Sequence, residues 1–196
     1  MNAINNLLSI IRADYYRNFG TDRISFLRIL INPRIRFFFL FRSLNFSLSH
    51  RNHLFQRVFF WILERSYNGL QLKLSIDIPY ECQIGRGLFL PHMNGIVINK
   101  NTTIGENCTI LHQVTIGNNM FKSLDNVAII GNNVQVGAGA KIVGPITIGD
   151  NVTIGANAVV VKNIDDNSVV GGVPAVTLSN KVSKVYNDYS LQKKEK

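Results

Sequence analysis

The second half of the sequence repeats aliphatic residues at a period of six. One run extends from Ile98 to Ile116 and a second from Ile130 to Val160, and a glycine or another small residue usually follows each aliphatic residue. Three hexapeptides form one triangular coil of a parallel β-helix, with the aliphatic side chain inside, and coils stack at roughly 4.8 Å. An ordinary β-sandwich would show period two and irregular spacing. The pattern therefore predicts a mainly β fold, a left-handed parallel β-helix.

Two details of the repeat refine this prediction. Asparagine and aspartate fall at the expected corners, as in Asn132-Asn133 and Asp150-Asn151, because both residue types tolerate left-handed turn conformations. The step from Ile116 to Ile130 is fourteen residues, two more than two repeats. We therefore expect a loop extruded from the coil near residues 118–129, and such loops on a rigid scaffold often carry functional sites.

The part of the chain before the repeat shows helical spacing of its apolar residues. A first helix is expected to stop at Gly20. The pair Asn32-Pro33 has the form of a cap followed by proline in the first helical position, which predicts a second helix to about Phe46. A third helix is expected to begin near Leu54 and to stop near Asn68-Gly69.

These patterns divide the chain into three parts. Residues 1–75 form an α-helical N-terminal region, residues 76–178 the β-helix with its extruded loop, and residues 179–196 a basic tail. The formal net charge is +9, and residues 1–75 carry eleven Lys/Arg against three Asp/Glu, which gives +8 of it. No zinc finger, RNA-binding signature or recognition-helix pattern accompanies this charge, so nucleic acid is not the expected partner.

The basic residues of the N-terminal region alternate with phenylalanine in the stretch 34–42. This mixture favours a helix that packs in an oligomer, and peripheral contact with a membrane surface is the alternative. The apolar runs are far shorter than the ~20 residues a membrane span needs, and no signal peptide is evident. Cys82 and Cys108 do not make a disulfide framework and are interpreted as small buried hydrophobic residues in a reducing, cytoplasmic protein.

Several motifs together resemble the serine acetyltransferase-like branch of the hexapeptide acyltransferases over roughly residues 30–178. They are GLFLPHMNGIVI at 87–98, ILHQVTIG at 110–117, VGAGAKI at 136–142 and GGVPA at 171–175. The resemblance implies a homotrimer, or a dimer of trimers, with acetyl-CoA in the groove between neighbouring prisms and no metal. It places the catalytic histidine at His92 and the aspartate that orients it at Asp77. A cap at the entry to the first coil is the alternative role for Asp77.

The resemblance also places the acetyl-CoA site along one chain. The positions that this implies are Gly117, Ala138, Gly139, Ala156, Val173 and Pro174, and Lys181 is added as a residue that could reach the CoA phosphates. The chemistry agrees with this assignment, because a hydroxyl needs a base and histidine titrates near ~6.5. A carboxylate on the second ring nitrogen fixes the tautomer. The thioester reacts by direct attack, so neither cysteine is needed as a nucleophile.

The sequence departs from the serine enzymes where they hold their amino-acid substrate. Pro91 stands where they have an aspartate before the histidine, and Asn126 and Val127 stand where they have an arginine–histidine pair on the loop. Losing a charge-assisted carboxylate contact typically costs several kcal/mol. The sequence is similar in these features to bacterial capsule, exopolysaccharide and lipopolysaccharide O-acetyltransferases, which predicts a sugar hydroxyl as the acceptor. His112, Asn94 and Asn126 are expected to contact that acceptor.

Other functions remain open at this point. They are serine O-acetylation in cysteine biosynthesis, N-acetylation of a nucleotide sugar, and a non-catalytic hexapeptide scaffold. A γ-class carbonic anhydrase shares the fold but needs three histidine ligands, and only His92 and His112 lie in the repeat region. His112 stands twenty residues after His92, so it is a second candidate for the base, although a positioning role is favoured.

Overall fold

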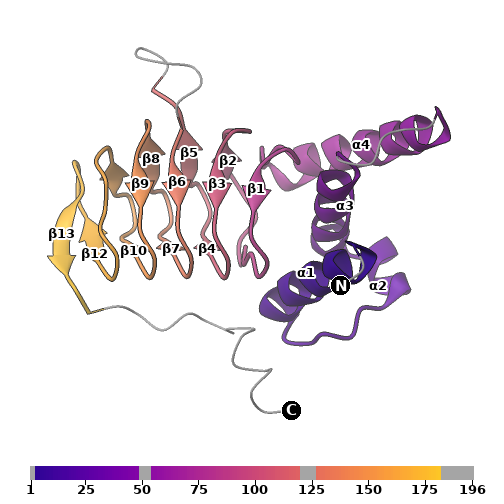
Figure 1. Cartoon of the computed structure of the whole chain (residues 1–196), viewed down its shortest axis with the longest axis horizontal. Coiled ribbons are helices and arrows are strands. Elements are labelled where there is room, and N and C mark those ends of the chain that lie inside the picture. Colours follow the sequence, from indigo (N-terminus) through magenta and orange to yellow (C-terminus); the bar gives the residue numbers. More distant parts are fainter. Residues whose placement is uncertain (1–2, 49–53, 120–126, 182–196) are drawn as a thin grey trace.

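The computed structural model describes residues 3–48, 54–119 and 127–181, with the side chains of 54–56 left undescribed. Four helices come first and a prism of short strands follows, and the helices gather at the end of the prism where its first coil begins (Figure 1). The helices are α1 (Ala3–Phe19), α2 (Phe26–Ile31), α3 (Pro33–Ser47) and α4 (Leu54–Leu74).

The strands form three sheets along the prism. The first sheet contains β1 (Gln83–Ile84), β3 (Thr103–Ile104), β6 (Ile129–Ile130) and β9 (Thr147–Ile148). The second contains β4 (Thr109–Ile110), β7 (Gln135–Val136), β10 (Thr153–Ile154), β12 (Val169–Gly171) and β13 (Val176–Ser179). The third contains β2 (Val97–Ile98), β5 (Thr115–Gly117), β8 (Lys141–Val143) and β11 (Val159–Val160).

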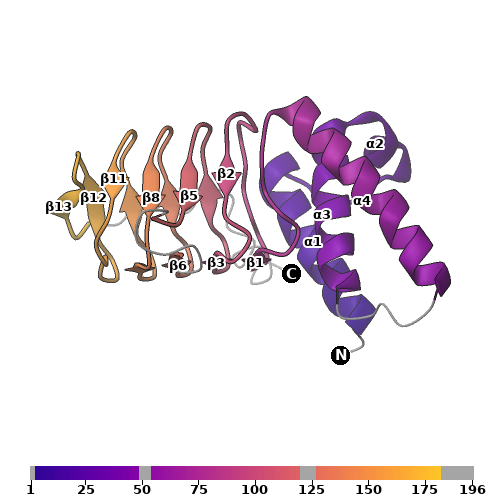
Figure 2. The ribbon, with the colours of Figure 1, turned by 90° about the horizontal axis from the view of Figure 1, so that it is seen from above.

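Consecutive strands step from one sheet to the next, and each strand pairs in parallel with the equivalent strand of the following coil. Ile98 pairs with Ile116 and Ile116 with Ile142, so the period-six residues stack directly on one another inside the prism. These side chains are 2% exposed or less from Ile98 to Val160. The β-helix predicted from the repeat is therefore present, consistent with the expected left-handed form, and β13 turns back antiparallel on β12 at the far end (Figure 2).

The asparagine corners behave as their chemistry predicts. Asn133, Asn151 and Asn167 all have φ of 57° or 58°, in the left-handed region. Their side chains form a ladder from coil to coil, with Nδ2 of Asn133 donating to Oδ1 of Asn151 at 2.9 Å and Nδ2 of Asn151 to Oδ1 of Asn167 at 3.0 Å. The amide ladder satisfies the polar corner along the prism.

Three boundaries differ from the sequence prediction. Helix α4 does not stop at Asn68-Gly69 but runs to Leu74, because Leu70 is buried against the core and Ser75, with φ 53°, supplies the turn instead. The short helix α2 was not predicted, since six residues with none buried give no periodic signal. Ile129 belongs to strand β6 and not to the extruded loop, and residues 120–126 of that loop lie outside the described part.

The Asn32-Pro33 cap is confirmed, since the Asn32 side chain accepts hydrogen bonds from the backbone N–H of Arg34 and Ile35. Much of the Arg/Phe-rich stretch that follows packs inside its own chain, and its predicted role in an oligomer stays a prediction. Phe37 and Phe41 are fully buried, and Arg42 is 4% exposed. Within the described residues, no helix is both long enough and apolar enough to cross a membrane.

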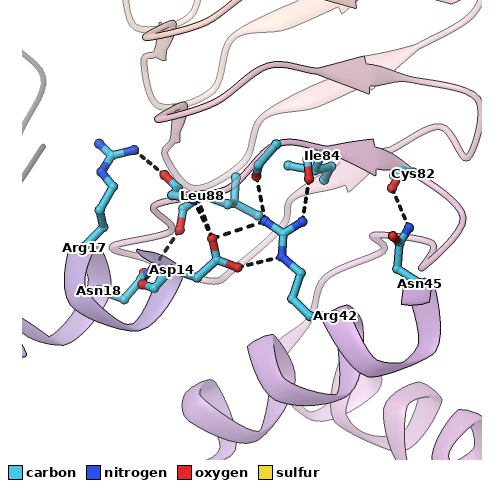
Figure 3. A network of polar contacts seen from close by, with 10 residues as sticks. Asp14, Arg17, Asn18, Arg42, Asn45, Cys82, Ile84 and Leu88 are labelled. Atoms are coloured by element: carbon cyan, nitrogen blue, oxygen red, sulfur yellow. Dashed lines mark hydrogen bonds and ion pairs between the residues drawn. The ribbon is translucent and has the colours of Figure 1, made fainter. Parts of the chain in front are cut away.

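Side chains of the helices terminate the open edge of the first coil (Figure 3). Arg42 donates from Nη2 to the carbonyl of Gly85 at 2.7 Å and from Nη1 to that of Ile84. Asp14 accepts the backbone N–H of Gly87 at 2.8 Å and of Leu88 at 2.9 Å. A free strand edge exposes unpaired backbone groups, so these contacts replace the missing neighbouring coil.

Further contacts of the same kind hold the segment that leads to His92. Asn18 donates to the carbonyl of Leu88 and accepts from the N–H of Leu90. Arg17, which is fully buried, donates to the carbonyls of Gly87 and Cys108. The helical region therefore fixes the position of residues 84–90.

Candidate active site

The edge of the prism between the second and third sheets carries most of the residues singled out from the sequence; we call it the histidine edge. Each coil crosses it between its second-sheet and third-sheet strands, as His92, His112, Ala138 and Ala156 do in successive coils. The backbone hydrogen bonds that join the coils there are Gln113 N to Asn94 O at 2.8 Å, Gly139 N to His112 O at 2.9 Å, Asn157 N to Ala138 O at 2.8 Å and Val159 N to Gly172 O at 3.0 Å. These bonds place Asn94, His112, Ala138 and Ala156 in one column, and His92 lies two residues before Asn94 in the same turn.

His92 and His112 form a pair at this edge. Their ring centroids lie 5.7 Å apart and the ring planes meet at 87°. His92 is exposed, whereas His112 is half-buried and its Nδ1 atom is buried without a hydrogen-bond partner in the described part of the chain. The pair offers one accessible imidazole for proton transfer and a second ring directly beside it.

Asp77 lies at the start of the third sheet, one coil before Val97. Its backbone N–H donates to the Ile96 carbonyl and its carbonyl accepts from Ile98, both at 2.8 Å, so Asp77 is in register with Val97. Its side chain is exposed and, within the described residues, makes no hydrogen bond or ion pair with His92. The structure thus places Asp77 next to the histidine edge, and its orienting role stays a prediction.

The turn that presents His92 includes Asn94. The backbone N–H of Asn94 donates to the His92 carbonyl at 3.1 Å, and Gly95 follows with φ 65°. The N–H of Gly95 donates to the carbonyl of Ser75 at 2.7 Å, which fixes the turn to the preceding coil. The Asn94 side chain is exposed at this edge, so it is available to a ligand.

The predicted acetyl-CoA residues divide between two edges. Ala138, Gly139 and Ala156 lie on the histidine edge, and the turn with Val173 and Pro174 closes its far end, since the Ala175 N–H donates to the Val159 carbonyl at 2.9 Å. Gly139 has a structural requirement of its own, because a Cβ atom built there would lie 2.0 Å from Oδ1 of Asn157, at φ 74°.

Gly117 and Lys181 stand apart from this column. Gly117 ends β5 on the opposite side of the third sheet, where its carbonyl accepts from the Gly144 N–H at 3.0 Å. Lys181 follows β13 and is exposed. Asn126, predicted to contact the acceptor, lies outside the described residues, while Val127 is half-buried just before β6.

A pocket near the histidines was not predicted. It has a volume of about 380 Å³ and its lining combines α1, α3 and the first coil: Arg17, Asn18, Phe19, Gly20, Arg34, Phe89 and Pro91. These residues are distant in sequence, so no local motif joins them. Of these residues, only Arg34 lies in a stretch that the sequence singled out, and that basic stretch was interpreted as a packing helix.

The cysteines take no part in this site. Both are buried free thiols, as predicted. Burial is the main cause that raises the pKa of each thiol to about 12, and for Cys82 the nearby Glu81 and Asp77 carboxylates raise it further. Among the described residues, no group of three His, Cys, Asp or Glu side chains is arranged to hold a metal ion.

Stacked hexapeptide coils are typical of the hexapeptide-repeat transferases, and this is the class that the fold indicates. Residues 128–162 match the family model of the bacterial transferase hexapeptide (six repeats). The chain is 38% identical over 134 residues to the serine acetyltransferase of Helicobacter pylori strain J99. The alignment covers 68% of this chain and 77% of that enzyme. The chain belongs to the serine acetyltransferase family and is an acetyl-CoA-dependent O-acetyltransferase.

Solved structures agree with this assignment. The serine acetyltransferase of Neisseria gonorrhoeae in complex with serine superposes with a TM-score of 0.71 at 28% identity, covering 90% of this chain and 72% of that one. The Brucella abortus enzyme in complex with coenzyme A gives 0.69 at 27% identity, covering 92% and 70%. The chain spans only 44% of the length of the Buchnera aphidicola serine acetyltransferase, to which it is 42% identical over 123 residues.

The relatives support the predicted class of enzyme but not the predicted acceptor. They support the hexapeptide acetyltransferase class, but they favour serine acetyltransferase, the alternative, over the predicted capsule or exopolysaccharide enzyme. The assignment to polysaccharide biosynthesis therefore has no support among them.

Proposed function

We propose that this enzyme transfers the acetyl group of acetyl-CoA to a hydroxyl that binds at the histidine edge, with His92 as general base. The observation that carries the proposal is the exposed His92 ring, 5.7 Å from the ring of His112, which is itself in column with Ala138 and Ala156. The base and the small-residue track for a long thioester thus share one edge. Effective acyl transfer requires the acceptor and the thioester to meet in this way.

In the proposed reaction, His92 accepts the proton of the acceptor hydroxyl as the oxygen attacks the thioester carbonyl carbon. The tetrahedral intermediate then collapses, the C–S bond breaks, and the protonated imidazole returns its proton to the CoA sulfur. Asp77 is proposed to orient the His92 ring and to stabilise its protonated form. His112 and Asn94 are proposed to hold the acceptor, because the His112 ring lies beside the His92 ring and the Asn94 side chain is exposed at this edge.

The acetyl-CoA chain is proposed to run along the histidine edge away from His92. Small side chains at Ala138 and Ala156 would let the pantetheine approach the backbone, and Val173, Pro174 and Lys181 would meet the nucleotide end. Gly117 lies on the opposite edge, so it can join this site only from a second copy of the chain. A homotrimer with sites between its prisms accounts for both sets of residues, and sedimentation equilibrium tests it.

L-Serine is the acceptor that the relatives favour, since the matched enzymes carry serine in their names and one structure contains serine. A sugar hydroxyl is the second candidate. The observation that favours it is Pro91, an uncharged residue directly before His92, together with half-buried Val127 at the end of the loop. Neither side chain carries a group that can pair with an ammonium or a carboxylate.

The deciding experiment measures thiol release from acetyl-CoA with purified wild-type enzyme and each acceptor in turn. L-Serine, neutral and acidic monosaccharides, bacterial oligosaccharides and an amino sugar nucleotide form the panel, and the acetylated product is identified by mass spectrometry. Acceleration by serine supports cysteine biosynthesis, and O-acetylation of a saccharide supports the second candidate. A nitrogen-linked product would replace both with N-acetyl transfer, and no transfer to any acceptor would favour a non-catalytic scaffold.

A further inference from the structure

The pocket between the helical region and the first coil adjoins the proposed base. Pro91, which lines it, is the residue before His92, and Phe89 lines it from the same segment of the first coil. Arg34 donates from Nη2 to the Leu90 carbonyl at 2.9 Å. Because each residue spans at most ~3.6 Å of chain, the Cα atoms of Leu90 and His92 are within about 7 Å of each other. A ligand of monosaccharide size can reach from Arg34 to His92.

Arg34 lines this pocket, and not all of its hydrogen-bond donors have a partner. Its Nε atom is buried and has no hydrogen-bond partner in the described part of the chain. Its guanidinium carbon lies 5.7 Å from the centre of the Phe19 ring. Neither of the two ion pairs Arg42–Asp14 and Arg86–Glu106 includes Arg34, and within the described residues its guanidinium bonds a backbone carbonyl rather than a carboxylate. A buried donor with no partner is costly unless a ligand supplies an acceptor.

The backbone around Arg34 is fixed before any ligand binds. The Asn32 side chain accepts the Arg34 N–H at 3.0 Å and begins α3 at this point, with Pro33 as its first residue. The cap therefore sets where the guanidinium emerges. A preformed donor loses less conformational entropy on binding than a flexible surface arginine.

The rest of the lining adds positive charge and no negative charge. Arg17 is fully buried and is held by the carbonyl of Cys108 at 3.0 Å and by the Thr109 hydroxyl at 3.0 Å. Its guanidinium carbon lies 5.5 Å from the centre of the Phe89 ring, at the wall of the pocket. No lining residue is acidic. Burial also lowers the pKa of Arg34, as expected for a cation with little compensation.

We infer that this pocket binds a carboxylate of the acceptor through the guanidinium of Arg34, beside the hydroxyl that His92 activates. The inference rests on the proposed acetyl transfer and adds to it the pocket and the residue that recognise the carboxylate of the acceptor. A carboxylate in the pocket accepts hydrogen bonds from the guanidinium and balances the charge of the half-buried Arg34 side chain. An amino acid and an acidic sugar share this group, and the experiment distinguishes them.

Two matched pairs of probes test the inference. L-Serine is compared with L-serinamide, and D-glucuronate with D-glucose, in calorimetric binding to the wild-type enzyme and in the acetyl-CoA transfer assay. The enzyme is expected to prefer the carboxylate member of one pair by about 10- to 100-fold. The pair that shows the preference identifies the source of the carboxylate.

Arg34→Ala is expected to abolish that preference, raising KM for the carboxylate acceptor about 10- to 100-fold while leaving KM for acetyl-CoA unchanged. Arg34→Lys retains the charge without the Nε donor and should recover part of the loss. Arg28→Ala removes an exposed arginine of α2 outside the pocket and should behave as wild type. Thermal melting of each variant identifies any loss of folding, and Arg34→Lys then carries the test.

The outcomes separate the two proposals. Equal binding of the charged and neutral probes to the wild-type enzyme, or a preference that survives in Arg34→Ala, overturns the pocket assignment even if acetyl transfer occurs. Carboxylate binding that depends on Arg34, without transfer to any acceptor, supports the pocket and contradicts the proposed function.

Discussion

Asp14 and Arg42 form a buried ion pair that fixes helices α1 and α3 to the first coil of the prism. Nε of Arg42 lies 2.7 Å from Oδ2 of Asp14, and Nη2 lies 3.1 Å from Oδ1, in a bidentate arrangement. Their side chains are 4% and 0% exposed. Each partner also bonds backbone groups of residues 84–88, so the pair replaces a neighbouring strand rather than only neutralising charge.

Asp14→Asn is expected to lower the free energy of unfolding by about 3–5 kcal/mol, because it leaves the Arg42 charge buried without its counter-ion. Urea unfolding at pH 7 measures this. The control is Glu106→Gln, which breaks the exposed pair with Arg86 at 2.9 Å and should cost less than about 1 kcal/mol. Equal losses in the two variants would contradict the capping role of Asp14.

This network also shows what the sequence could not predict. Asp14 and Arg42 are 28 residues apart in sequence, and each bonds backbone of the first coil. No periodic pattern reports a contact of that kind. The stacked core from Ile98 onward was predictable because each inward residue contacts its equivalent in the next coil, so the physical contact and the sequence period are the same.

The candidate site likewise has a part that the sequence could predict and a part that it could not. The positions of Asn94, His112 and Ala138 on one edge follow from the repeat, since equivalent corner residues stack, and His92 lies two residues before Asn94 in the same turn. The Arg34 pocket does not follow from the repeat, because it joins the end of α1, the start of α3 and the first coil. The exact length of the extruded loop was also unpredictable, since Ile129 carries no signal that distinguishes a loop residue from the outward residue of β6.

His92→Ala is expected to lower kcat for acetyl transfer at least about a hundredfold, the usual loss for a general base. His112→Gln, which keeps a polar side chain, should change kcat less than about tenfold and raise KM for the acceptor, since His112 is proposed to hold the acceptor rather than take its proton. Steady-state thiol release over a range of acceptor concentrations separates the two effects. Full activity in His92→Ala, with a hundredfold loss in the His112 variant, would transfer the base to His112.

The proposed acetyl-CoA site along the histidine edge can be tested by placing a large side chain in it. Ala156 is exposed on the histidine edge, and Ala156→Phe should raise KM for acetyl-CoA by about tenfold or more, equivalent to at least 1.4 kcal/mol of lost binding. Val161→Phe is the control, because Val161 is 46% exposed in the same coil but follows β11 at another edge. A larger effect at Val161 would place the cofactor on that edge, and melting temperatures confirm that both variants fold.

The buried thiols predict how stability changes at alkaline pH. The pKa of Cys82 and of Cys108 rises from the ordinary 9.0 to about 12 in the folded chain, mainly through burial. Below pH 9 both folded and unfolded chains keep the thiols protonated, so their full contribution to stability is present. Between pH 9 and 12 only the unfolded chain loses these protons, and stability must fall. Burial also raises the pKa of Tyr67 well above 10, which adds a loss of the same sign.

Replacing both cysteines by alanine is therefore expected to make stability less sensitive to alkaline pH, although the variant starts lower at pH 7 because of the lost packing. The measurement is the urea midpoint at pH 7 and pH 10 for wild type and the double variant. Cys82 also raises the pKa of Tyr67, so the double variant loses that part of the tyrosine contribution as well, in the same direction. A drop in midpoint that is as large in the double variant as in wild type would mean that the thiols ionise equally in the two states, and that Cys82 and Cys108 are not excluded from water in the folded enzyme.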